Sequence, residues 1–225
     1  MSRDTVIIVA GGEGRRLGGP LPKQFLPLGE VPVLWHTLLA FHRYDPSLQI
    51  ILVLHPDWTG HWQKVSRTLQ PSIDYQITTG GETRFHSVAN GLLLAEEGGL
   101  TAVHDASRPL VSRELLERTF TAAREKGNAV PATAVHNSLR EVTDDGNRPV
   151  DRSRYRSIQT PQIFPTRLLK EAFRQPYDPA FTDEATVAER MGVKIHLVEG
   201  EDRNIKITTA FDLKVAEMIL HNDPQ

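Results

Sequence analysis

Short apolar runs alternate with segments of helically spaced apolar residues along the first half of the chain. Val6 to Ala10 and Ile50 to Leu54 are continuous apolar runs, which is typical of strands buried on both faces of a parallel sheet. Further strands are expected at residues 75–78, 101–104 and 128–134, and helices at 32–41, 58–69, 85–94 and from Ser112 onward. This alternation predicts an α/β fold with a Rossmann-like, doubly wound and mostly parallel sheet.

The alternation stops between Ser138 and Gln159. Residues 139–142 and 155–158 alternate apolar and polar side chains, and turn-forming residues lie between them at 144–147. We expect these two stretches to pair as a β-ribbon arm, at about 137–158, that projects from the sheet. Helices at 166–173, 183–191 and 210–220 and a strand at 194–198 complete the elements. Because no repeat or linker divides the chain, we expect a single domain over residues 1–225.

Composition narrows the classes of function. The chain has 39% hydrophobic residues, enough for one large core, and a formal net charge of -2. That charge indicates neither a nucleic-acid partner nor an anionic membrane partner. The absence of Cys excludes disulfides, thiolate metal sites and Cys nucleophiles. The first apolar run is too short for a secretory signal or a membrane span, so we expect a soluble, cytoplasmic protein.

Polar segments follow three of the expected strands. They are residues 11–23, 80–87 and 105–109. Ligands of open α/β sheets bind outside the carboxyl ends of the strands, so these segments form the candidate site.

The first of these segments is rich in glycine and contains Arg15, Arg16 and Lys23. It is not a dinucleotide fingerprint, because Leu17 stands where the third Gly is needed, and it lacks the Gly-Lys-Ser/Thr of a P-loop. Small residues after a strand let backbone N–H groups approach an anion, and three cations suit a triphosphate. The alternative is a solvated basic loop whose glycines only form turns.

Residues 10–17, followed by Pro22-Lys23-Gln24-Phe25, resemble the signature of sugar-phosphate nucleotidyltransferases. More narrowly, they resemble the 2-C-methyl-D-erythritol 4-phosphate cytidylyltransferase family of the non-mevalonate isoprenoid pathway. The resemblance runs over residues 5–218. It implies transfer of the cytidylyl group of CTP to a sugar-alcohol phosphate, release of pyrophosphate, and use of Mg²⁺. It also implies that Arg16 and Lys23 stabilise the transition state at the α-phosphate.

The second and third segments extend the resemblance. Residues 80–88 resemble the family segment that holds cytosine, and residues 104–109 match a His-Asp-Ala-Ala/Ser-Arg-Pro motif. Asp105 is thereby implied at the ribose, at Mg²⁺ or at the sugar alcohol. The CTP-binding residues implied in all are Ala10, Gly11, Gly12, Gly14, Gly81, Glu82, Ser87, Asp105 and Ala106. The alternatives are an ordinary strand-to-helix turn around Ser87, a local Asp105–Arg108 ion pair, and a packed, non-catalytic His104.

The arm and the C-terminal third also resemble the family. There the arm is exchanged between two subunits of a homodimer, which implies that Arg152 reaches the partner's site. The acceptor-binding residues implied are Asp105, Arg108, Ser138, Arg152, Thr160, Thr182 and Lys206. Thr182 also suits a helix N-cap, and the alternation of residues 204–208 suits a strand beside a cleft. Asn137 departs from the family, which often has Asp at that position.

The implied reaction needs no general base, because the nucleophile is already a phosphate anion. Catalysis then depends on positioning and charge neutralisation by Arg16, Lys23, Arg152 and Lys206. One alternative is a ribitol-5-phosphate cytidylyltransferase, which has the same fold and chemistry. A second is a non-catalytic nucleotide-binding module. An NAD(P)-dependent oxidoreductase is disfavoured by Leu17.

Overall fold

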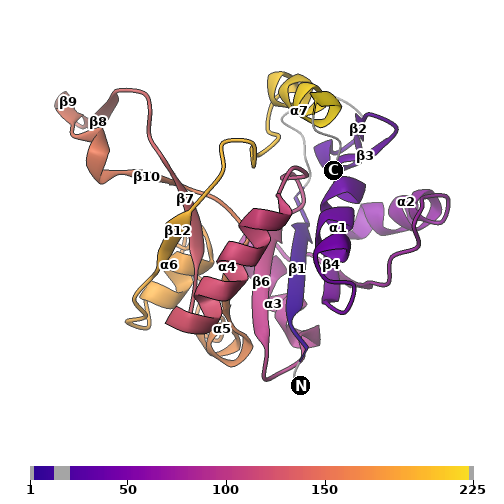
Figure 1. Ribbon diagram of the computed structural model, residues 1–225. Coiled ribbons are helices and arrows are strands. Elements are labelled where there is room, and N and C mark those ends of the chain that lie inside the picture. The colour runs from indigo at the N-terminus through magenta and orange to yellow at the C-terminus, as the bar shows by residue number, and fades with distance from the viewer. Residues whose placement is uncertain (1–2, 13–20, 223–225) are drawn as a thin grey trace.

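A five-stranded sheet forms the centre of the part of the chain that the computed structural model describes, residues 3–12 and 21–222. Its strands, in spatial order, are β11 (Gln162–Pro165), β6 (Leu100–Asp105), β1 (Thr5–Ala10), β4 (Gln49–Leu54) and β5 (Gln76–Thr79). All neighbours are parallel except β11, which runs antiparallel to β6 (Figure 1). The predicted Rossmann-like α/β class is confirmed, whereas the edge strand β11 was not predicted.

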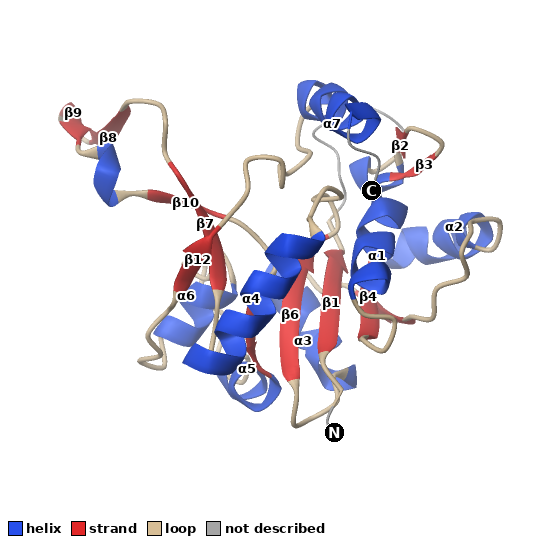
Figure 2. Ribbon diagram, viewed as in Figure 1, coloured by secondary structure: helices blue, strands red, loops and turns tan. Residues whose placement is uncertain are grey.

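Helices cover both faces of this sheet (Figure 2). One face carries α1 (Val33–Tyr44), α2 (Pro56–Ser66) and α4 (Arg113–Lys126), and the other carries α3 (Arg84–Leu94), α5 (Thr166–Ala172) and α6 (Glu184–Glu189). Successive strand side chains point to opposite faces, so Ile8 joins one cluster and Ile7 the other. This is why β1 and β4 are apolar throughout.

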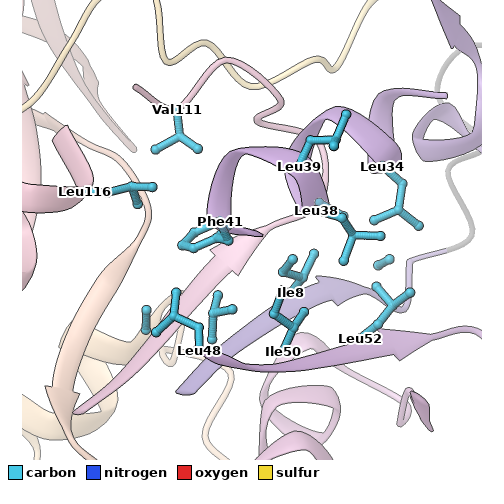
Figure 3. Close-up of a cluster of buried hydrophobic side chains, with 14 of the residues drawn as sticks. Ile8, Leu34, Leu38, Leu39, Phe41, Leu48, Ile50, Leu52, Val111 and Leu116 are labelled. Carbon is cyan, nitrogen blue, oxygen red and sulfur yellow. The ribbon is translucent and has the colours of Figure 1, made fainter. Parts of the chain in front are cut away.

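The cluster under α1 is the larger of the two. Leu34 and Leu38 of α1 pack onto Ile8, Ile50 and Leu52 of the sheet (Figure 3). All five side chains are buried, and together they hold the carboxyl end of β1 in place.

A second, smaller sheet extends the fold beyond β11. It consists of β10 (Arg156–Ile158), β7 (Val130–Ala134) and β12 (Leu197–Glu199), with β10 antiparallel and β12 parallel to β7. An isolated antiparallel bridge between Ala129 and Ile163 joins the two sheets.

The arm is a hairpin that projects away from the sheets (Figure 1). It pairs β8 (Leu139–Thr143) with β9 (Gly146–Val150), and the short helix η3 (Arg152–Arg154) leads back to β10. The projecting arm was predicted, but its pairing was wrong: residues 156–158 pair with β7, and residues 139–143 pair with β9. A two-residue turn leads straight into the partner strand, and Gly146 accepts the φ of 134° required there.

Further elements lie near the carboxyl end of the sheet. They are η2 (Lys23–Phe25), the hairpin of β2 (Pro27–Leu28) and β3 (Val31–Pro32), and the C-terminal helix α7 (Ala210–Asn222). Residues 204–208 form a loop and not the expected strand. A hydrogen bond from Ile207 N to Ser107 O, 2.8 Å, holds this loop against the segment that follows β6. Among the helices in residues 3–12 and 21–222, none is long and apolar enough to span a membrane.

Candidate active site

A cavity of about 310 Å³ opens at the carboxyl ends of β1 and β6. Among the residues predicted to bind CTP, Ala10, Gly11, Gly12, Gly81, Glu82, Ser87, Asp105 and Ala106 line it, together with the cations Lys23 and Lys206. Four parts of the chain that lie far apart in the sequence therefore meet at one place. Gly14, Arg15 and Arg16 lie outside the described residues.

Glycines let two of these segments approach one another closely. A Cβ atom added at Gly11 would lie 2.9 Å from Ser87 Oγ, and one added at Gly80 would lie 3.1 Å from Gly11 Cα. A larger residue at either position would push the end of β1 away from the segment before α3. The glycines thus shape a wall of the cavity, as the phosphate interpretation of the sequence requires.

Ser87 ties the turn before α3 together. Its Oγ accepts a hydrogen bond from Gly81 N at 3.1 Å and donates one to Thr83 O at 3.0 Å. Thr83 caps α3, with its side chain accepting from His86 N. Residues 80–87 therefore form the strand-to-helix turn that was the alternative for this segment, and Gly81, Glu82 and Ser87 of that turn also line the cavity.

Gln24 connects the glycine-rich segment with η2. Its buried Nε2 donates to Ala10 O at 3.1 Å and to Gly12 O at 3.3 Å. The next residue, Phe25, packs against Trp58 and Trp62 of α2. Lys23 therefore begins a short helix that is anchored on both sides.

Three cations surround Asp105, the last residue of β6. Lys206 Nζ lies 2.9 Å from Oδ2, Arg108 Nε lies 3.5 Å from Oδ2, and Arg84 Nε lies 3.5 Å from Oδ1. The Asp105–Arg108 pair that was an alternative for this segment is present, as one part of a larger cluster. Cations from residues 84, 108 and 206 converge on one carboxylate facing the cavity.

The cluster determines the protonation of its members. Burial by itself would raise the pKa of Asp105, but Arg84, Lys206 and Arg108 hold that pKa well below its usual range. Burial would likewise lower the pKa of Arg84, but Glu184 and Asp105 raise it above its ordinary value. Asp105 is therefore a carboxylate at neutral pH, able to accept hydrogen bonds but not to donate a proton.

His104 supports this cluster from behind. It is fully buried, its Nε2 lies 3.0 Å from Arg108 O, and its Nδ1 lies 3.1 Å from Thr160 Oγ1. A carbonyl can only accept, so Nε2 carries the proton and Nδ1 accepts from the Thr160 hydroxyl. Burial lowers the pKa of His104 to about 4, so the imidazole is neutral. His104 is a packed residue, as the alternative for it proposed.

Lys206 lies on a loop that is anchored to the same strand end. Asn204 is buried; its Nδ2 donates to Thr160 O at 2.9 Å, and its carbonyl accepts from Arg108 Nη1 at 2.7 Å. On the other side of Lys206, Ile207 N bonds to Ser107 O. These contacts present the ammonium group to the cavity.

The family comparison follows from this arrangement. The model of the family described as IspD: 2-C-methyl-D-erythritol 4-phosphate cytidylyltransferase matches residues 5–222. Proteins of that name from Bacteroides thetaiotaomicron and Bacteroides fragilis are each 49% identical to the chain. They cover 97% and 96% of this chain, and the matches span 100% and 99% of their own lengths.

The chain belongs to the IspD family. The crystal structure of 2-C-methyl-D-erythritol 4-phosphate cytidylyltransferase from Thermus thermophilus has the same fold, with a TM-score of 0.77 at 33% identity. The match covers 98% of this chain and 100% of that one. The resemblance inferred from the motifs is confirmed over nearly the whole IspD-family chain.

Several acceptor-binding residues predicted for this IspD chain do not line the cavity. Thr160 and Arg108 lie behind it, and the Thr160 hydroxyl accepts from Asp105 N at 3.1 Å. Ser138 and Arg152 are exposed at the arm, where an Arg152 Nη1 group donates to His136 O. Thr182 is exposed before α6; the N-cap expected there is wrong by one residue, because Asp183 caps that helix.

Three residues of the site had no role in the sequence interpretation. They are Gln24, Arg84 and Glu184. Arg84 makes two contacts with Glu184, Nη1–Oε1 at 2.5 Å and Nη2–Oε2 at 3.0 Å, although 100 positions separate the two residues. Both are the first residue of a helix, after Thr83 and Asp183 respectively. Cap residues are a sequence signal for such positions, but the pairing itself is not visible in the sequence.

The acidic side chains at the cavity bear on metal binding. Asp105 and Glu82 line it, and no cluster of three acidic or histidine side chains that could hold a metal occurs within the described ranges. Mg²⁺ commonly binds through one or two carboxylates, with substrate phosphates and water completing its coordination. This donor set fits a Mg²⁺ ion shared with phosphate, and not a metal held by protein alone.

Proposed function

We propose that this protein transfers the cytidylyl group of CTP to 2-C-methyl-D-erythritol 4-phosphate. A phosphate oxygen of the acceptor attacks the α-phosphorus of CTP. The bond from that phosphorus to the bridging β-phosphate oxygen breaks, and pyrophosphate leaves. The products are 4-diphosphocytidyl-2-C-methyl-D-erythritol, an intermediate of isoprenoid precursor synthesis, and pyrophosphate. Membership of the IspD family supports both substrates.

One observation carries this proposal: cations from distant segments of the chain line the same cavity as the glycine-rich segments. Lys23 and Lys206 both line a cavity whose lining includes Gly11, Gly12 and Gly81. Two anions must approach one another in the reaction, and fixed cations reduce their repulsion without reorganising during the step. In the part of the chain that the structure describes, Lys23 and Lys206 provide such cations at the carboxyl ends of β1 and β6.

We assign roles to the residues on this basis. Lys23, with Arg16, neutralises charge at the α-phosphate, and Gly81, Glu82 and Ser87 hold the cytosine. Asp105 lies where the ribose and the acceptor meet, and Lys206 binds the acceptor phosphate. Mg²⁺, held by CTP phosphates with Asp105, would neutralise charge on the triphosphate. These residues position the two phosphates, and none needs to move a proton.

The arm supplies the remaining contacts in this proposal. Arg152 and Ser138 are exposed on or beside a projecting hairpin, outside the cavity of their own chain. We assign them to the acceptor site of a second subunit in a homodimer with exchanged arms. We assign Thr182 to the same acceptor region, and we assign Thr160 to its support from behind the cavity, through the contacts with Asp105 N and His104. The proposed enzyme acts in the cytoplasm.

Pyrophosphate release by the purified protein tests this function. CTP, UTP, ATP and GTP are each paired with 2-C-methyl-D-erythritol 4-phosphate and with ribitol 5-phosphate, with Mg²⁺ or with EDTA. We expect the fastest release with CTP and the first acceptor, little release with EDTA, and a diphosphate product in the ³¹P spectrum. Lys23→Ala should lower turnover by about 10²–10³.

Two results would contradict the proposal. Binding of CTP without pyrophosphate release would indicate a nucleotide-binding module. Faster turnover of ribitol 5-phosphate would indicate the related cytidylyltransferase.

A further inference from the structure

The guanidinium group of Arg84 bridges two acidic side chains from different parts of the chain. Its two terminal nitrogens contact Glu184, at 2.5 and 3.0 Å, and its Nε lies 3.5 Å from Asp105 Oδ1. The Glu184 side chain is fully buried, and the Arg84 side chain is 28% exposed. One cation therefore connects the first turn of α6 with the carboxylate at the centre of the cavity.

Both ends of this bridge are held rigidly. Arg84 follows the N-cap Thr83 of α3. Glu184 follows Asp183, which forms a capping box with Thr186. Gln162 of β11 accepts from Ala185 N at 2.9 Å and donates to Asp183 Oδ2 at 2.9 Å, so α6 is attached to the main sheet. The position of the guanidinium is thus set by two helices and one strand.

The two oxygens of Asp105 face different cations. Oδ1 faces Arg84, whereas Oδ2 faces Lys206 at 2.9 Å and Arg108 at 3.5 Å. The positive charge of Arg84 thereby offsets part of the negative charge of Asp105 that its other neighbours experience. Without Arg84, a nearby positive charge that partly offsets the negative potential of Asp105 would be lost, so the Lys206 ammonium would be held more strongly at the carboxylate.

We propose that Arg84 is a positioning residue that shares the charge of Asp105 and so leaves the Lys206 ammonium able to bind the acceptor phosphate. Glu184 holds the guanidinium in place for this purpose. Arg84 also lines the cavity, and each of its terminal nitrogens makes one contact with Glu184; the role we assign to it runs through Asp105. The inference rests on the proposed function, in which Lys206 binds the acceptor phosphate.

A purely structural role for the Arg84–Glu184 pair makes a different prediction. Removing Arg84 alone leaves the buried Glu184 carboxylate without its partner and destabilises the fold in either case. Replacing both residues with Met removes the uncompensated charge, and such replacements of buried ion pairs are often tolerated. If the pair is only structural, the double variant should recover both stability and the wild-type KM for the acceptor. If Arg84 shares the charge of Asp105, the double variant should recover stability but not the wild-type KM.

The test compares wild type, Arg84→Met and the double variant Arg84→Met/Glu184→Met. Unfolding in urea gives stability, and steady-state pyrophosphate release gives kcat and the KM for each substrate. We expect the double variant to regain stability but to keep a KM for 2-C-methyl-D-erythritol 4-phosphate raised roughly three- to tenfold, with kcat less affected. If the double variant does not fold, Arg84→Gln/Glu184→Gln takes its place.

A second measurement does not depend on turnover. Acetylation of Lys206 by a succinimidyl ester, followed by mass spectrometry without substrates, reports how tightly its ammonium is held. We expect acetylation several-fold slower in the double variant than in wild type, since an amino group held in a tighter ion pair with Asp105 is less accessible to the reagent. If wild type releases no pyrophosphate, the proposed function fails while these rates still test the inference.

The exposed pair Arg174–Glu171 offers a matched control, with Arg174 Nη1 2.6 Å from Glu171 Oε2. Arg174→Met/Glu171→Met should leave the acceptor KM and the acetylation of Lys206 unchanged. A wild-type acceptor KM in the Arg84/Glu184 double variant would overturn the inference. So would an unchanged rate of Lys206 acetylation.

Discussion

The polar side chains at the end of β6 depend closely on one another. Asp105 is surrounded by Arg84, Arg108 and Lys206, while His104 contacts the Arg108 carbonyl and the Thr160 hydroxyl. Substituting any of these groups leaves a buried polar atom or charge without its partner, which costs more than the contact itself contributes. At the scale of single residues, the site is a network and not a set of independent contacts.

His104 makes this network sensitive to acid. Burial lowers its pKa to about 4, whereas an unfolded chain binds the same proton near pH 6.5. The unfolded state therefore binds more protons between these values, so stability falls as pH falls from about 6.5 to 4. One such group contributes at most about 1.4 kcal/mol per pH unit.

The variant His104→Gln isolates this contribution, because an amide can still donate to the Arg108 carbonyl. We expect the free energy of unfolding of the variant to depend less on pH than that of wild type over this window, as measured in urea. His36, whose pKa burial also lowers, is present in both proteins and cancels in the comparison. Equal slopes for the two proteins would show that His104 does not remain neutral in the fold.

At the scale of elements, the cavity is formed where the ends of β1 and β6, η2, α3 and the loop before α7 meet. The aromatic packing of Phe25 on α2 and the two hydrogen bonds of Gln24 hold η2 against the end of β1. The contacts of Gln24 and Phe25 therefore fix the position of Lys23, the first residue of η2. A shift of about 1 Å in such a group is enough to lower a rate about 10²-fold.

Gln24→Leu tests this dependence. The variant leaves the Ala10 and Gly12 carbonyls without their donor, so the end of β1 and η2 lose their connection. We expect kcat for pyrophosphate release to fall by about ten- to a hundredfold, with a loss of stability of about 1–3 kcal/mol.

Gln175 provides the control, because its Nε2 also donates to two backbone carbonyls, Ala172 O and Val187 O, away from the cavity. Gln175→Leu should lower stability by a similar amount without changing kcat. If both variants lost activity in proportion to stability, Gln24 would have no special part in positioning Lys23.

At the scale of the whole molecule, the fold separates a packed body from a projecting arm. Two apolar clusters fix the central sheet from both sides, while residues 139–154 extend beyond the smaller sheet. Val142, at the tip of this arm, is 83% exposed. The arrangement agrees with the proposed exchange of arms, in which Arg152 serves the cavity of the partner subunit.

Complementation tests that exchange. Arg152→Ala and Lys23→Ala subunits are each expected to form inactive homodimers. In mixed dimers, one cavity combines an intact Lys23 with Arg152 from the partner subunit. Random mixing should restore about a quarter of wild-type pyrophosphate release, because half of the dimers are mixed and each has one complete site. Confirmed mixed dimers without activity would show that Arg152 acts within its own subunit or not at all.

The sequence alone determined four of the five central strands, most helices and most of the residues that line the cavity. These follow from local rules: strands buried on both faces are apolar throughout, glycines allow close approach of backbone, and ligands bind at the carboxyl ends of parallel strands. For that reason the three polar segments meet at one cavity, and the eight described residues that the family resemblance implied at CTP line it together with Lys23 and Lys206.

Only the tertiary structure decided which distant segments meet. The partner of Arg84 is Glu184, 100 positions away, and residues 156–158 pair with β7 although an alternating stretch lay closer in sequence. The edge strand β11 likewise exists because β6 offers it a backbone partner. Such pairings depend on close packing and on satisfying buried charges and backbone groups over the whole fold, and no single stretch of sequence contains that information.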